Sequence, residues 1–114
     1  MPKIERIESG TRVSHAVIHN GVVYVAGVLS AGKTVKEQTK NVLKGVDATL
    51  KRAGTDKSKL LSATVWLTDM GTFDEMNSEW DAWVSQGNPP ARACVEAKLV
   101  KPGYRVEIAV IAAL

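Results

Sequence analysis

The segment Val22–Val28 reads VVYVAGV, a run of β-branched, aromatic and small residues that is typical of a β-strand. Side chains alternate between the two faces of a strand, and here both alternating sets are apolar or glycine. The strand therefore needs apolar cover on both faces of its sheet. The segment Leu60–Leu67 is nearly as apolar, so the same requirement extends to a second strand.

Two helices are predicted, and the first has clear start and stop signals. Thr34 and Glu37 have the spacing of a capping box, in which the threonine hydroxyl accepts from the N–H of Glu37 and the carboxylate accepts from the N–H of Thr34. Apolar residues then recur every three or four positions as far as Ala53, and Gly54 can adopt the left-handed conformation that ends a helix. We expect a helix over 35–53.

The second helix repeats this pattern. Thr72 and Glu75 have the same capping-box spacing, an apolar stripe with two tryptophans follows, and Gly87 comes after the stripe. We expect a helix over 73–86.

The remaining apolar segments are predicted strands, at 3–7, 13–20, 22–28, 60–67, 91–99 and 105–113. The order β, β, β, α, β, α, β, β fits an α+β fold, with one mixed six-stranded sheet and two helices on one face, in a single domain over 1–114. Because two helices cover only one face, we expect another copy of the chain to cover the other.

Composition disfavours several classes of protein. The single cysteine, Cys94, cannot form a disulfide within the chain, and there is no Cys-x-x-Cys pair or Cys/His cluster to ligate zinc or an iron–sulfur cluster. The net charge is +3, but lysines alternate with acidic residues along the chain, a pattern that does not favour nucleic acid as a partner. The charged start and the short apolar run Ile108–Leu114 predict a soluble, cytoplasmic protein with no membrane partner.

The predicted strand 91–99 carries the first candidate functional residue. Its odd-numbered residues are apolar and are expected to lie beneath the helices, so that Arg92 and Cys94 face the expected subunit interface. A guanidinium among small apolar neighbours needs an anion to offset its desolvation, either a protein carboxylate or a ligand carboxylate. Glu107, on the last strand, is the nearest candidate partner.

Three stretches of the chain resemble a known family. Residues 88–95 (NPPARACV), 106–108 (VEI) and 23–27 (VYVAG), with the order of elements along the whole chain, resemble the Rid (YjgF-like) reactive-intermediate deaminase family. Residues 77–84 (NSEWDAWV) are similar to its YoaB-like branch. The resemblance implies the chorismate-mutase-like α+β fold and a homotrimer, in which three sheets form an inner barrel and clefts lie between subunits.

The resemblance also implies an activity, the hydrolysis of enamine and imine intermediates. The substrates are small 2-imino acids such as 2-iminopropanoate, the products are 2-keto acids and ammonia, and no metal or cofactor takes part. Arg92 matches the family's essential arginine, which grips the substrate carboxylate. Cys94 matches a cysteine that shapes the pocket, Glu107 a carboxylate that positions or deprotonates water, and Gly27 a glycine beside the cleft.

One difference from the family pattern bears on activity. RidA-type members carry a Gly-Pro-Tyr-Ser-Gln segment whose tyrosine lines the pocket, and here Val13 stands at the tyrosine position. His15 is a candidate substrate contact in its place. Two alternatives to deamination stay open: a non-catalytic module that binds 2-keto acids or related metabolites and, more weakly, the ribonuclease activity attributed to some members of the family.

Each candidate residue also has a purely structural interpretation. Cys94 fits a small buried hydrophobe better than a reactive thiol. Glu107 could simply pair with an arginine, Arg92 or Arg105, across the sheet. His15 and a second histidine four residues later fit edge or interface positions better than a metal site, because no third ligand is evident.

Overall fold

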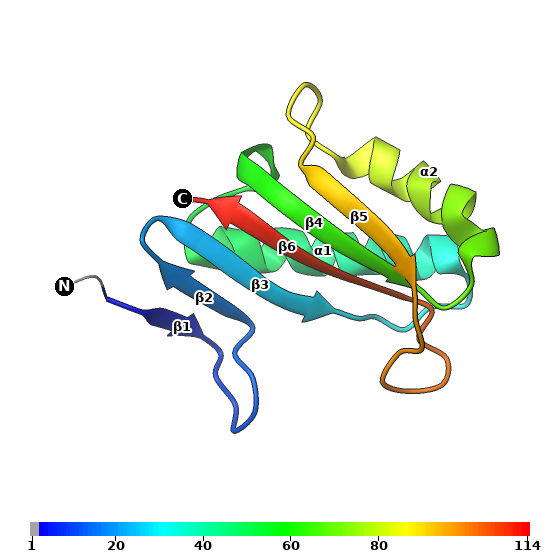
Figure 1. The fold of residues 1–114 in the computed structure, drawn as a ribbon, viewed down its shortest axis with the longest axis horizontal. Coiled ribbons are helices and arrows are strands. Elements are labelled where there is room, and N and C mark those ends of the chain that lie inside the picture. Colours follow the sequence, from blue (N-terminus) through cyan, green and yellow to red (C-terminus); the bar gives the residue numbers. More distant parts are fainter. Residues whose placement is uncertain (1–2) are drawn as a thin grey trace.

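The computed structural model describes residues 3–114, which form one six-stranded sheet and two helices (Figure 1). The strands are β1 Glu5–Ile7, β2 Ala16–His19, β3 Val22–Val28, β4 Leu60–Leu67, β5 Ala91–Glu96 and β6 Val106–Ala113. The helices are α1 Val35–Ala53 and α2 Phe73–Trp83, and the 3₁₀ turns are η1 Lys57–Lys59 and η2 Met70–Thr72. The predicted order of strands and helices is confirmed.

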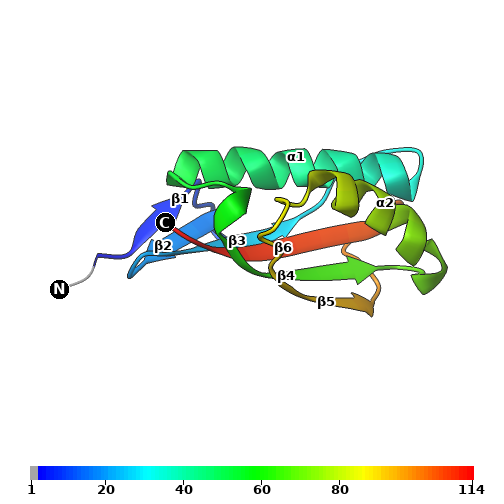
Figure 2. The same ribbon diagram turned by 90° about the horizontal axis from the view of Figure 1, so that it is seen from above.

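The strands lie in the order β1-β2-β3-β6-β4-β5. Neighbouring strands are antiparallel except β4 and β5, which are parallel and are joined by α2 as a crossover. Both helices lie on the same side of the sheet (Figure 2), as the sequence predicted. The opposite side of the sheet is called the open face below.

The hydrophobic core lies between α1 and the middle strands. One set of alternate residues on β3, β4 and β6 is buried beneath the helices, together with the apolar stripe of α1. The principal buried side chains are Val23, Val25, Val42, Leu43, Val46, Leu50, Ala63, Val65, Leu67, Val106, Ile108 and Val110. Because side chains alternate along a strand, this packing decides which residues of a strand face the helices and which face the open side.

Helix α1 has the predicted bounds. The hydroxyl of Thr34 accepts from the N–H of Glu37 at 3.0 Å, and Gly54 ends the helix with φ of 91°. The second half of the predicted capping box is wrong, because the Glu37 carboxylate accepts from the N–H of Lys33 at 3.2 Å instead of that of Thr34. The Glu37 carboxylate therefore still accepts from a backbone N–H at the start of the helix, but from that of Lys33, the residue before Thr34.

Helix α2 begins at the predicted residue, Phe73, but its predicted cap and its predicted end are wrong. Thr72 makes no side-chain cap, because its hydroxyl donates to the carbonyl of Asp69 at 2.7 Å within the preceding 3₁₀ turn. The helix ends at Trp83, and Gly87 lies in a later turn. Because β5 is parallel to β4, the chain must return to the start of β4, and α2 together with residues 84–90 makes this return.

Four strands are shorter than predicted: β1 and β6 start one or two residues late, and β2 and β5 differ by more. β2 begins at Ala16 because a turn comes before it, in which the N–H of Gly10 donates to the carbonyl of Val13 at 2.8 Å. β5 ends at Glu96, and its pairing with β4 stops one residue later, where the N–H of Ala97 donates to the carbonyl of Leu67.

A buried glutamine joins two loops at one end of the sheet. Gln38 on α1 is 1 % exposed, and its amide nitrogen donates to the carbonyls of Gly32 at 3.1 Å and Gly103 at 2.8 Å. Its amide oxygen accepts from the N–H of Arg105 at 2.9 Å. One side chain therefore satisfies three backbone groups that precede α1 and β6.

We predict that Gln38→Leu lowers the free energy of unfolding by about 2–4 kcal/mol, because three backbone groups lose their partner in a buried site. Urea unfolding followed by circular dichroism measures this loss. Asn41→Ala is the matched control, since Asn41 lies on the same helix but donates only one long bond of 3.4 Å, to Ala31. Equal losses in the two variants would contradict the assigned role of Gln38.

Candidate functional site

Arg92 lies on the helix side of β5, so the predicted orientation of this strand is wrong. In the parallel pairing with β4, Arg92 lies opposite Ala63 and Cys94 lies opposite Val65, and both β4 residues are buried beneath the helices. The apolar residues of β5 face the open side instead, with Val95 44 % exposed. The apolar pattern was real, but it marks the open face of the sheet.

Helix α2 holds the guanidinium of Arg92. Nη1 donates to Oδ1 of Asn77 at 2.9 Å. The guanidinium carbon lies 4.9 Å from the ring centroid of Trp80 and 5.8 Å from that of Phe73, within the range of cation–π attraction. Within residues 3–114, Arg92 makes no ion pair with a carboxylate. Its positive charge is therefore held in place without being neutralised by the protein.

These three residues of α2 were not predicted as part of the site. Phe73, Asn77 and Trp80 follow one another at intervals of four and three residues, so they share one face of the helix. A signal was present in the sequence, because Asn77 places a polar side chain in a stripe that is otherwise apolar.

Glu107 and Gly27 lie together on the open face. The pairing of β3 with β6 contains a β-bulge between Val25 and Val28, where Gly27 lies next to Glu107. A β-carbon at position 27 would overlap the Glu107 carboxylate. Glycine here thus leaves room for the carboxylate beside the strand.

The structure separates Arg92 from Glu107. They lie on opposite faces of the sheet, and β4 runs between their strands. In the described part of the chain, Glu107 forms no ion pair with Arg92 or Arg105. The alternative interpretation, in which Glu107 only pairs with an arginine, is therefore not supported within one copy. Within one copy of the chain, these two candidate residues do not form one site.

His15 lies beside Gly27 at the edge of α1. Its Nδ1 is 2.6 Å from a carboxylate oxygen of Glu8, which also pairs with Arg52 at 2.7 Å. The hydrogen bond and positive charge of Arg52 hold the pKa of Glu8 below its ordinary value. A hollow of about 370 Å³ is lined by His15, Gly27 and small residues of α1 such as Ala48. His15 is therefore near one candidate residue, Gly27, and lies just before β2, far along the chain from Arg92 on β5.

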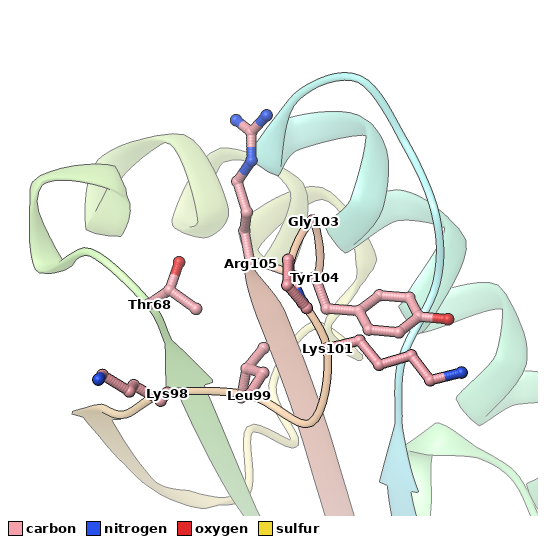
Figure 3. A pocket seen from close by; sticks show the side chains of 8 residues that line it. Thr68, Lys98, Leu99, Lys101, Gly103, Tyr104 and Arg105 are labelled. Carbon is pink, nitrogen blue, oxygen red and sulfur yellow. The ribbon is translucent and has the colours of Figure 1, made fainter.

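A second hollow, of about 450 Å³, lies where β4 and β5 end and β6 begins. It contains three cations, Lys98, Lys101 and Arg105, but Figure 3 shows their side chains pointing in different directions. Arg105 also donates to the carbonyl of Lys33 at 3.3 Å. The cations of this hollow do not converge on a common point where an anion could bind.

Residues 3–114 contain neither a candidate metal site nor a candidate membrane-spanning helix. In this range no group of three or more His, Cys, Asp or Glu side chains is placed to hold a metal ion. No helix in the same range is both long enough and apolar enough to cross a membrane.

Comparison with known proteins places the whole described chain in one family. A family model described as endoribonuclease L-PSP matches residues 3–114. The chain belongs to this family. A solved structure of a YjgF-family protein from Neisseria meningitidis is 45% identical to it, with a TM-score of 0.96, and the match covers 97% of this chain and 94% of that one. The sequence-based assignment to the YjgF-like family and its fold is confirmed.

Two curated relatives are informative: one shows the branch of the family, and the other carries the name of an enzyme. The RutC family protein YoaB of Escherichia coli is 44% identical over 112 residues, which are 97% of this chain and 98% of the relative. This match confirms the YoaB-like branch. A 2-iminobutanoate/2-iminopropanoate deaminase of Rattus norvegicus is 35% identical over 107 residues, which are 87% of this chain and 77% of the relative.

Cys94 of this L-PSP family member is half-buried and packs against the core beneath the helices. Burial raises the pKa of its thiol, and the positive charge of Arg92 opposes this effect only in part. The environment of Cys94 is that of a small structural residue, in which the reactive thiolate is disfavoured.

We predict that Cys94 reacts slowly with iodoacetamide at neutral pH, and that the midpoint of its rate against pH lies above that of the unfolded chain. Arg92→Gln moves the midpoint higher still, because it removes the charge that lowers the thiol pKa. Mass spectrometry of the modified chain over a pH series measures both effects. A midpoint below that of the unfolded chain would identify an activated thiol instead.

Proposed function

We propose that this chain hydrolyses small 2-imino acids, in their enamine or imine forms, to 2-keto acids and ammonia. The observation that carries the proposal is Arg92, a half-buried guanidinium that α2 holds in place and that has no carboxylate partner in the described chain. A substrate carboxylate would complete its hydrogen bonds and offset its desolvation. The name of the rat relative, a 2-iminobutanoate/2-iminopropanoate deaminase, supports the same reaction.

The proposed sites lie between copies of the chain in a homotrimer. The open face favours such an assembly, because Tyr24 is 46 % exposed and Val95 is 44 % exposed on a face that also carries small residues such as Ala93 and Ala109. Contact between copies also explains why Arg92 and Glu107 lie on opposite faces of one sheet. In the proposed cleft, Arg92 comes from one copy, and Glu107 and Gly27 come from its neighbour.

The proposed mechanism starts with the substrate carboxylate. Arg92 binds it through two parallel N–H bonds, which fixes the distance and direction of the neighbouring C=N carbon. Holding the reacting groups in place supplies much of the rate enhancement, because a protonated imine is already electrophilic. Gly27 leaves space beside the Glu107 carboxylate for a water molecule.

Glu107 acts on the attacking water in the proposed reaction. Its carboxylate accepts a proton as the water oxygen bonds to the C=N carbon, and the π electrons move to nitrogen, giving a carbinolamine. The same proton then passes to the amine. As the C–N bond breaks and ammonia leaves, the hydroxyl O–H bond breaks, its electron pair forms C=O and its proton passes to Glu107. This proton then leaves with the ammonia, so that one protonated imine and one water give one 2-keto acid and one ammonium ion.

A non-catalytic metabolite-binding module is the second candidate. Val13 is 64 % exposed where RidA-type members have a pocket tyrosine, so one polar contact of those members has no counterpart at this position. His15 beside Gly27 is the proposed replacement. Binding of 2-keto acids without turnover would favour this second function, and RNA cleavage that survives Arg92→Ala would favour a ribonuclease.

We predict that the native protein speeds the loss of 2-iminopropanoate generated by an amino-acid oxidase, and that Arg92→Ala abolishes the effect because the carboxylate loses its anchor. Trapping the remaining imine with semicarbazide gives the rate. Lys98→Ala is the matched control, since Lys98 is an exposed cation just beyond the same strand and should leave the rate unchanged. Equal rates for native protein and Arg92→Ala would refute the proposed site.

The cleft between copies gives a second prediction. Arg92→Ala and Glu107→Gln are each inactive alone, but mixed trimers contain interfaces at which both native residues meet. Unfolding and refolding the two variants together at equal amounts should restore roughly a quarter of native activity, because about three quarters of randomly assembled trimers are mixed and each mixed trimer has one intact cleft out of three. Sedimentation confirms the assembly of each sample.

The refolded mixture has a direct control, which is each variant unfolded and refolded alone. No gain in the mixture, with native protein refolding to full activity, would show that one copy supplies both residues or that one of them is dispensable.

A further inference from the structure

We propose that Asn77 is a positioning residue for Arg92, and that its neutral amide is selected because it orients the guanidinium without neutralising it. The proposal rests on the proposed function, since it concerns how the carboxylate-binding residue is prepared. Asn77 lies on α2, and its amide oxygen accepts a hydrogen bond from the Arg92 guanidinium.

The contacts around Arg92 restrict it in two ways. The 2.9 Å bond from Nη1 to Asn77 Oδ1 fixes rotation of the guanidinium plane. The rings of Trp80 and Phe73, at 4.9 Å and 5.8 Å from the guanidinium carbon, limit its movement away from α2. Trp80 is itself buried, so the ring belongs to the fixed core of the molecule.

The bond to Asn77 uses one N–H of the five that a guanidinium carries. A carboxylate that binds with two parallel bonds needs two N–H groups on one edge of the guanidinium. The Asn77 contact thus leaves enough donors for a ligand, and it reduces the conformational entropy that Arg92 loses when a ligand binds.

The chemistry of position 77 distinguishes positioning from simple support of the fold. An aspartate would have the same shape and would hold the guanidinium more firmly, because the bond would become an ion pair. The same carboxylate would compete with a ligand carboxylate for the positive charge. Stability and ligand affinity should therefore change in opposite directions in Asn77→Asp, whereas a residue that only supports the fold should change them together.

The first experiment uses the 114-residue chain. Calorimetry measures its affinity for pyruvate, and thermal unfolding measures its stability. Asn77→Ala should bind pyruvate about five- to tenfold more weakly, the loss expected when binding must order one flexible side chain. Asn77→Asp should unfold at the native temperature or above, and bind pyruvate more weakly than Asn77→Ala does. Its affinity should recover as the pH is lowered and the introduced carboxylate is protonated.

Asp47→Ala is the matched control. Asp47 accepts a bond of 2.9 Å from the indole N–H of Trp83, so this variant also removes one side-chain bond made by α2, but to α1 and not to Arg92. It should lower the unfolding temperature and leave pyruvate affinity unchanged. If the Asn77 variants lose stability and affinity together, as a general loosening of α2 would cause, positioning is refuted.

A second measurement does not depend on ligand binding. Nitrogen-15 relaxation of the Arg92 Nε–H group should report a rigid side chain in the native protein and a mobile one in Asn77→Ala. A rigid Arg92 in Asn77→Ala would overturn the inference while leaving the proposed function intact. Conversely, pyruvate binding that is equal in native protein and Arg92→Ala would overturn the proposed function, and the relaxation data would still decide whether Asn77 orders Arg92.

Discussion

A sheet that is apolar on both faces, with helices on only one of them, is the constraint on which the other features of this molecule depend. The helix side forms the core and fixes the register of every strand. The open side carries Tyr24, Val95 and the Glu107 carboxylate on a surface that suits a second copy of the chain. The proposed cleft uses this division, because its two principal residues come from different faces.

Features with local chemical causes could be predicted from the sequence. Helix α1 has the predicted bounds because Thr34 and Gly54 each satisfy a helix end through contacts close by in the chain. The apolar pattern and the helix and turn signals correctly gave the order of the elements, and the family resemblance correctly gave the fold. The cap and the end of α2 were harder to predict, because the preceding 3₁₀ turn occupies the Thr72 hydroxyl and residues 84–90 leave the helix to reach β5.

The arrangement of the candidate site depends on contacts between distant segments, and here the sequence pattern misled. Alternation on β5 separates Arg92 from its apolar neighbours, but it does not say which set faces the helices. The answer depends on Asn77 and two aromatic rings, which make the helix side suitable for a guanidinium. The bulge that places Gly27 beside Glu107 likewise has no local sequence signal that alternation could reveal.

Gln38 has a consequence for the end of the sheet that carries Glu107. Its amide oxygen accepts from the N–H of Arg105, one residue before β6 begins and two residues before Glu107. A buried residue of α1 thereby anchors the backbone close to the point from which the Glu107 side chain extends. For the proposed reaction this backbone is preorganised, in the terms used for enzyme electrostatics: the frame is built during folding, so that little reorganisation energy would remain to be supplied when a substrate binds.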